Sequence, residues 1–223
     1  MTASVAPATE GRAIRWARLY DVGTTLLSFG RLSALHRRVV ELAGIIPGER
    51  ILDVGCGPGR LALTVGTVTG AGGEVCGLDP APEMIALARG KATHLGARVR
   101  FDVGVIEALP YPALYFDAVL STLMLHHLPD ELKRRGLTEI YRVLKPDGRI
   151  VAVDFGATPA HGMGHLLCVL RLRTGWDHAE RLGEMFREAG FHAVKMESTG
   201  HRGLACVRGR KPREHRGCST SSE

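Results

Sequence analysis

Residues 50–59 read RILDVGCGPG, a short apolar run that ends in a cluster of glycines. Such a run is typical of a buried strand that leads into a tight turn, because glycine lets the backbone turn sharply and approach a ligand closely. The next residues, LALTVGTVT at 61–69, have the apolar pattern of a helix. A strand, a glycine turn and a helix in this order open a parallel α/β sheet, in which ligands bind beyond the carboxyl ends of the strands.

The same alternation of strands and helices continues along the chain. We predict further strands at 74–79, 99–105, 116–122 and 149–155, and helices at 82–94 and 130–143. An irregular stretch at 156–176 precedes a predicted helix at 177–190 and two strands at 191–198 and 203–210, which we expect to pair antiparallel. The pattern predicts an α/β fold: a Rossmann-like, seven-stranded, mostly parallel sheet with helices on both faces and an antiparallel C-terminal strand pair.

The chain is predicted to hold one domain with an extension at each end. Residues 1–12 are small and polar and are expected to be disordered, whereas 13–48 show helical periodicity and are expected to form helices that cover the site. Residues 49–210 form the expected core. The basic segment 211–223 is expected to be a second disordered end.

The charge of the chain bears on its partners. The formal net charge is +6, and many of the arginines lie near the two ends of the 223 residues. These ends are either solvated or attracted to an anionic surface such as lipid headgroups or nucleic acid. Because no aromatic residues are interleaved with the terminal basic residues, nucleic acid is the disfavoured partner.

The cysteines and the apolar runs bear on location. The five cysteines are scattered, without a CxxC pair or a His/Cys cluster at metal-ligand spacing. This pattern predicts reduced thiols in the cytoplasm and no metal site. The chain has no run of 18 apolar residues, and its start lacks the pattern of a secretory signal, so we expect neither a membrane-spanning helix nor secretion.

The spacing of the glycines distinguishes between two kinds of nucleotide site. Gly55, Gly57 and Gly59 form GxGxG, whereas the dinucleotide fingerprint GxGxxG needs a glycine where this chain has Arg60. That difference disfavours an NAD-dependent oxidoreductase. Asp79 ends the second predicted strand, and a carboxylate there can accept hydrogen bonds from both hydroxyls of a ribose. The alternative role of Asp79 is to cap the helix that follows.

Five segments in a fixed order carry a resemblance to a known family. They are ILDVGCGPGR, GLDPAPEMIALARGKA, EALPYP, FDAVLSTLMLHHLP and RVLKPDGRIVAVDFG, which together span about residues 49–155. The chain resembles the class I S-adenosyl-L-methionine (SAM)-dependent methyltransferases, and more narrowly their small-molecule, UbiE-like (methyltransferase type 11) branch. The resemblance implies a protein that binds SAM and transfers its methyl group to a small or lipid-like acceptor, such as a quinone, a phenol or a phospholipid headgroup.

The resemblance also implies a cofactor site built from the ends of several strands. The methionine part of SAM would be held by Asp53, Gly55, Cys56, Gly57 and Gly59. Its ribose would be held by Asp79, and its adenine by Pro80, Met84, Ile106 and Glu107. Ser121 would close the floor of the site, and Tyr20 would help to cover the cofactor. Val105 departs from the family pattern, because relatives often carry an acid there that hydrogen-bonds the adenine amino group. The loss of one such bond is expected to weaken binding by about 1 kcal/mol.

The chemistry of a methyl sulfonium limits what the protein must supply. The sulfonium is already electrophilic, so the main tasks are alignment of the reactants and exclusion of water. A general base is needed only if the acceptor must lose a proton. His126 and His127 are candidates for that base, and the alternative is that they shape the helix that follows. We expect the acceptor to contact 13–44 and 156–176; the second is either a core helix or an amphipathic segment at a membrane surface.

Two other functions stay open at this point. An RNA or protein methyltransferase would carry a motif of the Asn/Asp-Pro-Pro-Tyr type after the fourth strand, where this chain reads STLM at 121–124. A non-catalytic SAM-fold binding protein is the second alternative, and Val105 is its only support. The sequence leaves the oligomeric state open.

Overall fold

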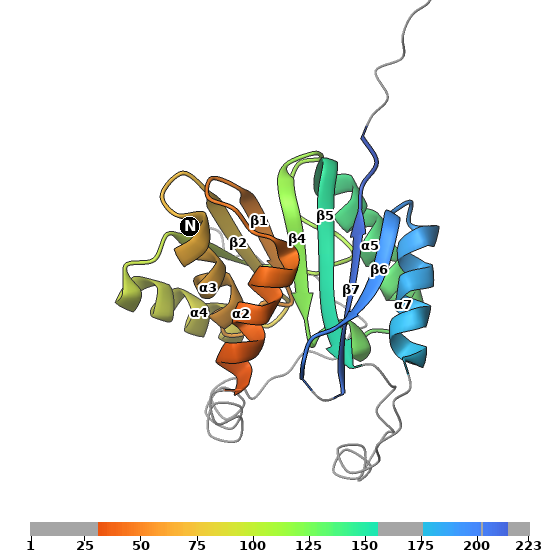
Figure 1. The fold of residues 1–223 in the computed structure, drawn as a ribbon. Helices are drawn as coiled ribbons and strands as arrows, with labels where there is room; N and C mark the ends of the chain where they lie inside the picture. The colour runs from red at the N-terminus through yellow and green to blue at the C-terminus, as the bar shows by residue number, and fades with distance from the viewer. Residues whose placement is uncertain (1–30, 156–175, 202, 214–223) are drawn as a thin grey trace, which may run out of the picture.

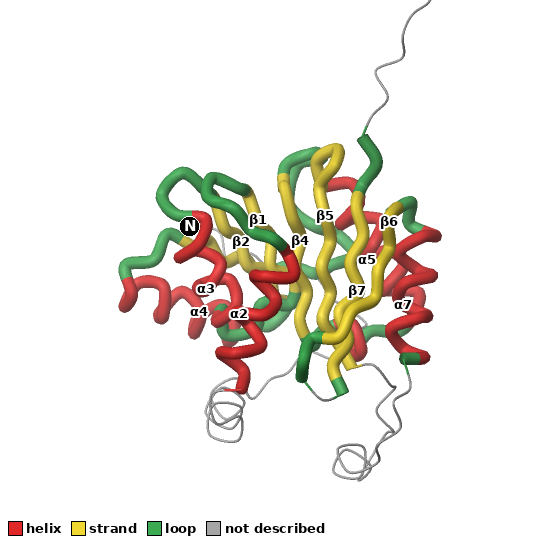
Figure 2. Tube along the Cα trace, in the orientation of Figure 1, coloured by secondary structure: helices red, strands yellow, loops and turns green. Residues whose placement is uncertain are grey.

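The computed structural model describes residues 31–155, 176–201 and 203–213, which form one sheet with helices on both faces (Figure 1). Its strands are β1 (Arg50–Val54), β2 (Glu74–Asp79), β3 (Val99–Val103), β4 (Phe116–Thr122), β5 (Leu144–Phe155), β6 (His192–Ser198) and β7 (Leu204–Arg210). Its helices are α2 (Arg31–Ala43), α3 (Arg60–Thr69), α4 (Pro82–Leu95), α5 (Asp130–Val143) and α7 (Asp177–Glu188), and a 3₁₀ turn, η1 (Leu125–His127), precedes α5. The helices α2, α3 and α4 cover one face of the sheet, and α5 and α7 cover the other (Figure 2).

The strand order determines where a ligand can bind. Across the sheet the order is β3-β2-β1-β4-β5-β7-β6, and only β7 runs antiparallel to its neighbours, β5 and β6. From β1 the chain adds β2 and β3 on one side of the sheet, and it then adds β4 and β5 on the other side. The carboxyl ends of β1 and β4 therefore flank a crevice. The predicted fold class is confirmed, including the antiparallel C-terminal pair. β7 follows β6 in the chain yet lies between β5 and β6.

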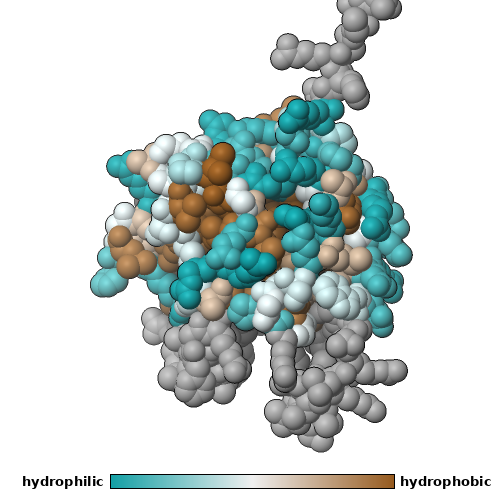
Figure 3. Space-filling view, viewed as in Figure 1, coloured by the Kyte–Doolittle hydropathy of each residue, from teal (hydrophilic) through white to brown (hydrophobic). Residues whose placement is uncertain are grey.

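The two faces of the sheet have separate cores, because side chains alternate along a strand. On β1, Ile51 belongs to the apolar cluster that packs with α2, α3 and α4, whereas its neighbour Leu52 belongs to the cluster that packs with α5 and α7. Both side chains are fully buried. Figure 3 shows the α2 side of the molecule, where polar surface surrounds an apolar area in the middle of the view. β1, which leads into the glycine turn, is thus held firmly from both sides.

Two strands differ from their predicted limits by more than one residue. β5 begins at Leu144 rather than at 149, because Leu144 pairs with Phe116 ahead of an irregularity in the β4–β5 ladder. β3 ends at Val103 rather than at 105. Val105 therefore belongs to the loop that follows β3, beyond the carboxyl end of the strand.

Lys211, the first residue of the end predicted to be disordered, is bonded to the core. The Lys211 side chain is buried, and its Nζ donates hydrogen bonds to the carbonyls of Tyr141 and Leu144 at 2.7 and 2.8 Å. Its backbone nitrogen also donates to the carbonyl of Gly148 at 2.8 Å. A lysine at this place satisfies carbonyls at the end of α5, which have no partner within the helix. The fold therefore continues past the predicted limit of the core at 210.

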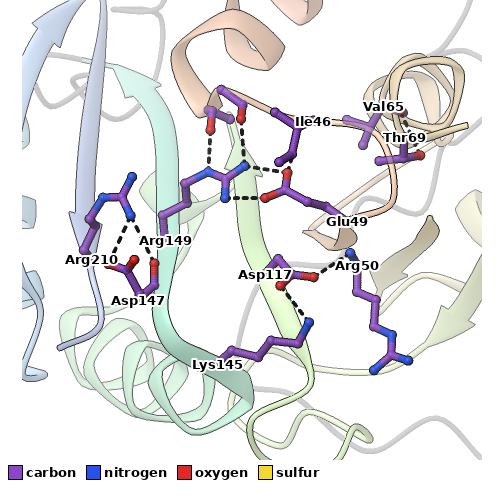
Figure 4. Close-up of polar contacts among 12 residues, drawn as sticks. Ile46, Glu49, Arg50, Val65, Thr69, Asp117, Lys145, Asp147, Arg149 and Arg210 are labelled. Carbon is purple, nitrogen blue, oxygen red and sulfur yellow. Dashed lines mark hydrogen bonds and ion pairs between the residues drawn. The ribbon is translucent and has the colours of Figure 1, made fainter. Parts of the chain in front are cut away.

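The last turn of α2 is held by an arginine of β5. The Arg149 guanidinium donates hydrogen bonds to the carbonyls of Ala43 and Gly44 and pairs with both carboxylate oxygens of Glu49 at 2.8 and 2.7 Å (Figure 4). These carbonyls end a helix and need outside partners. Arg149 thus joins α2 to the amino end of β1, at the edge of the sheet opposite to the glycine turn. Of the predicted N-terminal helices at 13–48, residues 13–30 lie outside the described residues, as does the predicted disordered end at 1–12.

Two expectations about the environment of the chain can be compared with the structure. Cys56, Cys76 and Cys206 are buried free thiols, and the other two cysteines lie outside the described residues. Within the described ranges, no helix combines the length and the apolar character that crossing a membrane requires.

Candidate functional site

A cleft of about 200 Å³ lies where the strand order reverses, beyond the carboxyl ends of β1, β2 and β4. Residues from α2, the glycine turn, the starts of α3 and α4, the loop after β3 and the segment after β4 line it. The predicted cofactor contacts that line this cleft are Asp53, Gly55, Cys56, Gly57, Asp79, Pro80, Met84, Ile106 and Glu107. The fold therefore brings together predicted contacts from three separate parts of the sequence.

Two predicted contacts do not line the cleft, and a third lies outside the described residues. Gly59 is not among the described residues that line the cleft; its φ is 80°, and a Cβ there would lie 2.7 Å from the Phe101 ring. Its missing side chain allows α3 to pack closely against β3. Contact between Gly59 and the cofactor stays a prediction. Ser121 also lies outside the described lining, and its buried hydroxyl has no hydrogen-bond partner within the described ranges. Tyr20 lies outside the described residues.

Asp79 connects the glycine turn to the start of α4. Its Oδ2 accepts a hydrogen bond from the backbone nitrogen of Gly57 at 2.9 Å, and its Oδ1 accepts one from the backbone nitrogen of Ala81 at 2.9 Å. Burial raises the pKa of Asp79, and these two hydrogen bonds oppose that effect. Since each carboxylate oxygen has a second lone pair, both can still accept a bond from a ligand. The side chain does not cap the first turn of α4, because its partner Ala81 is itself the residue that precedes the helix.

Asp53 is a buried carboxylate, and one of its oxygens has no hydrogen-bond partner among the described residues. The side chain is 1% exposed and accepts a hydrogen bond from the backbone of Ala62, in the first turn of α3. Its Oδ2 has no partner among the described residues. Burial raises the pKa of Asp53 to about 7, and the nearby Asp79 contributes in the same direction. A buried acceptor without a partner is costly, so this oxygen is suited to a cationic donor.

The middle of the glycine turn is open toward the cleft. Gly57 has a φ of 50°, and no atom lies within 4 Å of the place where a Cβ would be. A side chain there would adopt an unfavourable backbone conformation and fill that open space. The neighbouring thiol of Cys56 is buried, and burial together with the charges of Asp53 and Asp79 raises its pKa well above the usual range. Cys56 is therefore a neutral wall of the cleft and not a nucleophile.

The loop after β3 gives the cleft an apolar wall. Val105 and Ile106 are buried and line it, together with Glu107. Pro80 and Met84, from the start of α4, line the same cleft. Such a slot suits a flat aromatic ring, and a carboxylate at its border provides an acceptor. The side chain of Val105 contributes no polar atom to it.

Sequence reasoning missed a histidine on α2 that lines the cleft. His36 is 8% exposed, and burial, with a smaller contribution from Arg60, lowers its pKa to about 4. The imidazole is therefore neutral near pH 7. A signal was present in the sequence, because His36 lies one helical turn after Leu32 on the apolar side of the predicted helix.

A strained residue shapes the end of the cleft after β4. Leu123 has a φ of 55°, which is uncommon for a residue other than glycine, and its backbone nitrogen donates to the carbonyl of Val153 at 2.8 Å. The next residue, Met124, lies directly against Gly55, so closely that no Cβ could fit at Gly55. Leu123 and Met124 both line the cleft, and neither was predicted to do so.

The two candidate histidines after β4 have different surroundings. His126 Nδ1 lies 2.6 Å from Asp154 Oδ1, near the end of β5, and only 9% of the His126 side chain is exposed. His127 is exposed and lines the cleft, and its ring centroid lies 3.8 Å from that of His126. The structure therefore brings His127 to the cleft and places His126 behind it, in contact with a carboxylate.

The charges that line the cleft favour a cationic ligand. Asp53, Asp79 and Glu107 are acidic, whereas Arg60 is the basic residue among the described lining that carries a permanent charge. A pyrophosphate would be repelled by this set of carboxylates. In the part of the chain that the structure describes, no group of three or more histidines, cysteines and acids is arranged to hold a metal ion.

Known proteins with similar sequences are methyltransferases. Residues 51–148 match the family model described as a methyltransferase domain. The demethylmenaquinone methyltransferase of Thermus thermophilus is 42% identical over 145 residues, which cover 65% of this chain and 64% of that protein. The ubiquinone/menaquinone biosynthesis C-methyltransferase UbiE of Citrifermentans bemidjiense is 37% identical over 143 residues, which cover 63% of this chain and 59% of that protein.

A solved structure shows the same fold. A SAM-dependent methyltransferase from Aquifex aeolicus superposes with a TM-score of 0.66 at 23% identity, covering 81% of this chain and 92% of that one. The chain therefore has the fold of that methyltransferase, and residues 51–148 are similar in sequence to a methyltransferase domain. The curated relatives bear out the resemblance to the UbiE-like branch that the sequence indicates. It spans 64% and 59% of the length of the two curated relatives, less than two thirds of either.

Proposed function

We propose that this protein is a SAM-dependent methyltransferase that acts on a small or lipid-like acceptor. The observation that carries the proposal is the pair of buried carboxylates at the ends of adjacent strands. Asp53 has an oxygen without a partner among the described residues, and Asp79 holds the glycine turn while it keeps lone pairs for a ligand. This arrangement has a place for both an ammonium group and a ribose.

The residues present fit SAM part by part. Asp53 Oδ2 would accept a hydrogen bond from the ligand's ammonium group, and the open surface at Gly57 would admit its amino-acid part. Asp79 would accept hydrogen bonds from the ribose hydroxyls, and the apolar slot beside Ile106 and Met84 would take the adenine. When bound, SAM supplies an electrophilic methyl group on a sulfonium.

The chain's own residues would then orient the reactants and exclude water. The acidic lining stabilises a cation in the cleft, and the strained Leu123 places Met124 as an apolar wall against the glycine turn. Gly59 and Ser121 support the turn and the end of β4 from behind. Alignment and dehydration of this kind account for much of the rate acceleration that a transferase needs.

The names of the relatives support a quinone-like or phenol-like acceptor. One is named a demethylmenaquinone methyltransferase, and the other a C-methyltransferase of ubiquinone and menaquinone biosynthesis. A phospholipid headgroup is the second acceptor class that we propose to test. Contact with a membrane surface through 156–176, a cytoplasmic location and the absence of a nucleic-acid partner stay predictions.

The test has two measurements. A calorimetric titration with SAM should give saturable heat, and Asp79→Ala should weaken the binding. S-adenosylhomocysteine should then be released when the protein is incubated with SAM and a panel of reduced 1,4-naphthoquinone, simple phenols and phosphatidylethanolamine vesicles. SAM binding without formation of S-adenosylhomocysteine in the presence of any acceptor would support the non-catalytic alternative. Absence of SAM binding would contradict the proposed site.

A further inference from the structure

His126 and Asp154 form a buried pair at the ends of two neighbouring strands. β4 leads into the 3₁₀ turn that carries His126, and Asp154 is the last but one residue of β5. β4 and β5 are parallel neighbours, so their carboxyl ends lie side by side at the edge of the sheet that holds the cleft. The two side chains are 9% and 4% exposed, which is unusual for an ionisable pair unless it is well hydrogen-bonded.

The hydrogen bonds of Asp154 fix the direction of its side chain. Oδ1 accepts from the backbone nitrogen of Phe155 at 2.8 Å, and Oδ2 accepts from the backbone nitrogen of His126 at 2.9 Å. Oδ1 also lies 2.6 Å from His126 Nδ1. Because an ionised carboxylate can only accept, Nδ1 must carry the proton in this contact. In the neutral ring, Nε2 is then the nitrogen with a free lone pair, which is the tautomer of a base.

The ring of His126 lies directly behind the lining of the cleft. His126 stacks on His127, whose side chain lines the cleft, and its other neighbour is the Phe155 ring, nearly perpendicular at 4.8 Å. The ring contacts of His126 with nitrogen or oxygen atoms in the described ranges all use Nδ1. The other titratable groups nearby are His178, Lys133 and Asp130, and burial lowers the pKa of His178.

A role limited to shaping the turn explains only part of this arrangement. The bond from the His126 backbone to Asp154 Oδ2 already holds the turn, and any residue at position 126 could donate it. The bond at 2.6 Å to the ring depends on the histidine side chain, and its effect is to fix the tautomer and the orientation of the imidazole.

We propose that His126 is the proton acceptor of the methyl transfer and that Asp154 is its positioning residue. This inference rests on the proposed function and specifies it: the acceptor is a hydroquinone or phenol. A hydroxyl proton of the acceptor moves to His126 Nε2, and the resulting electron-rich oxygen or ring carbon forms the new bond to the methyl carbon. The electron pair of the broken carbon–sulfur bond stays on sulfur. If carbon is methylated, the proton on that ring carbon moves through water to the acceptor oxygen, which restores aromaticity, and His126 releases its own proton to solvent.

The experiment uses the full chain with SAM and reduced 1,4-naphthoquinone. His126→Gln should lower kcat about 100-fold, the usual size of a general-base contribution, while SAM affinity measured by calorimetry changes less than about twofold. Asp154→Asn should lower kcat by about tenfold or more, because the amide can donate to Nδ1 and favour the wrong tautomer. His94→Gln, at an exposed histidine of α4, is the matched control and should leave kcat unchanged.

Two readouts separate proton transfer from a structural effect. Added imidazole should restore activity to His126→Ala at least about tenfold, since the cavity can admit the missing base. Nitrogen NMR of the wild-type protein should show His126 protonated on Nδ1 without any substitution. Retention of wild-type kcat in His126→Gln, absence of rescue, or an Nε2–H tautomer would each overturn the inference. If the wild type forms no S-adenosylhomocysteine from SAM with any acceptor of the panel, the proposed function fails instead.

Discussion

Asp79 Oδ2 accepts the backbone hydrogen bond of Gly57 at 2.9 Å, so the acid at the end of β2 holds the turn that follows β1. A single carboxylate therefore has two tasks: it orders the glycine turn, and it faces the part of the cleft where we propose the ribose. Asp79 Oδ1, bonded to Ala81, extends the same connection to α4.

Asp79→Ala is expected to weaken SAM binding about 100-fold or more, because it removes two charge-assisted ligand bonds and loosens the turn. Asp79→Asn keeps one acceptor oxygen, so its affinity for SAM should fall less than that of Asp79→Ala. Calorimetric titration measures both. Glu83→Gln, at an exposed acid in the first turn of α4, is the control and should bind as the wild type does. Equal affinities for Asp79→Ala and Glu83→Gln would contradict the assignment.

Asp53→Asn is expected to stabilise the ligand-free protein while it weakens SAM binding. The folded pKa of Asp53, about 7, lies above its ordinary value of 3.8, so the folded chain binds more protons between these two values. Wild-type stability therefore falls as pH rises through this window, and a neutral amide avoids the loss. At about pH 8 the variant should gain about 1–2 kcal/mol.

Denaturant unfolding at several pH values measures the effect of Asp53→Asn. The gain should vanish near pH 4, where the wild-type carboxyl is protonated, and should reach its full size above about pH 7. A variant that is less stable than the wild type at pH 8, or one that binds SAM equally well, would show that the buried oxygen has no ligand role.

Val105→Asp is expected to tighten SAM binding. The substitution places a carboxylate in the wall where we propose the adenine, and one added hydrogen bond of about 1 kcal/mol corresponds to a gain of about five- to tenfold. Val105→Leu, which keeps the wall apolar, is the control. The ligand-free variant should unfold at a lower temperature, because Val105 is buried. Unchanged affinity in Val105→Asp would place the adenine elsewhere.

Arg149→Met is expected to destabilise the fold by about 3 kcal/mol, because it leaves Glu49 and two helix-end carbonyls without their buried partner. The side chains of Arg149 and Glu49 are 15% and 12% exposed. Arg213→Met is the comparison, since Arg213 pairs with Asp147 while 82% of its own side chain is exposed, and such pairs contribute little. Equal unfolding free energies for the two variants would contradict the role assigned to Arg149.

Much of the fold could be predicted because local pattern and tertiary structure agree. The strand at 50–54, the glycine turn and the helix that follows are each indicated by their own residues. Asp79 could be found for the same reason, since it ends an apolar strand at a fixed distance from the turn. In both places the chemistry depends on residues that are close in sequence to an element boundary.

The rest depends on contacts between distant parts of the chain. The pairing of His126 with Asp154 joins residues 28 positions apart, and no local pattern indicates it. The burial of Lys211 was missed because a basic residue near a polar end predicts exposure, whereas the ends of α5 supply carbonyls for its ammonium group. The packing of Gly59 against Phe101 likewise joins distant residues, and the glycine motif does not show it.

The position of β7 has a consequence for how the protein is made. A ribosome synthesises β5 and β6 before residues 204–210, yet β6 reaches the sheet only through β7. Until that strand emerges, the nascent β5 keeps one edge with unpaired backbone groups, a template on which other chains can pair. The strands that bear the proposed catalytic groups can thus assemble early, while protection against aggregation comes late in translation.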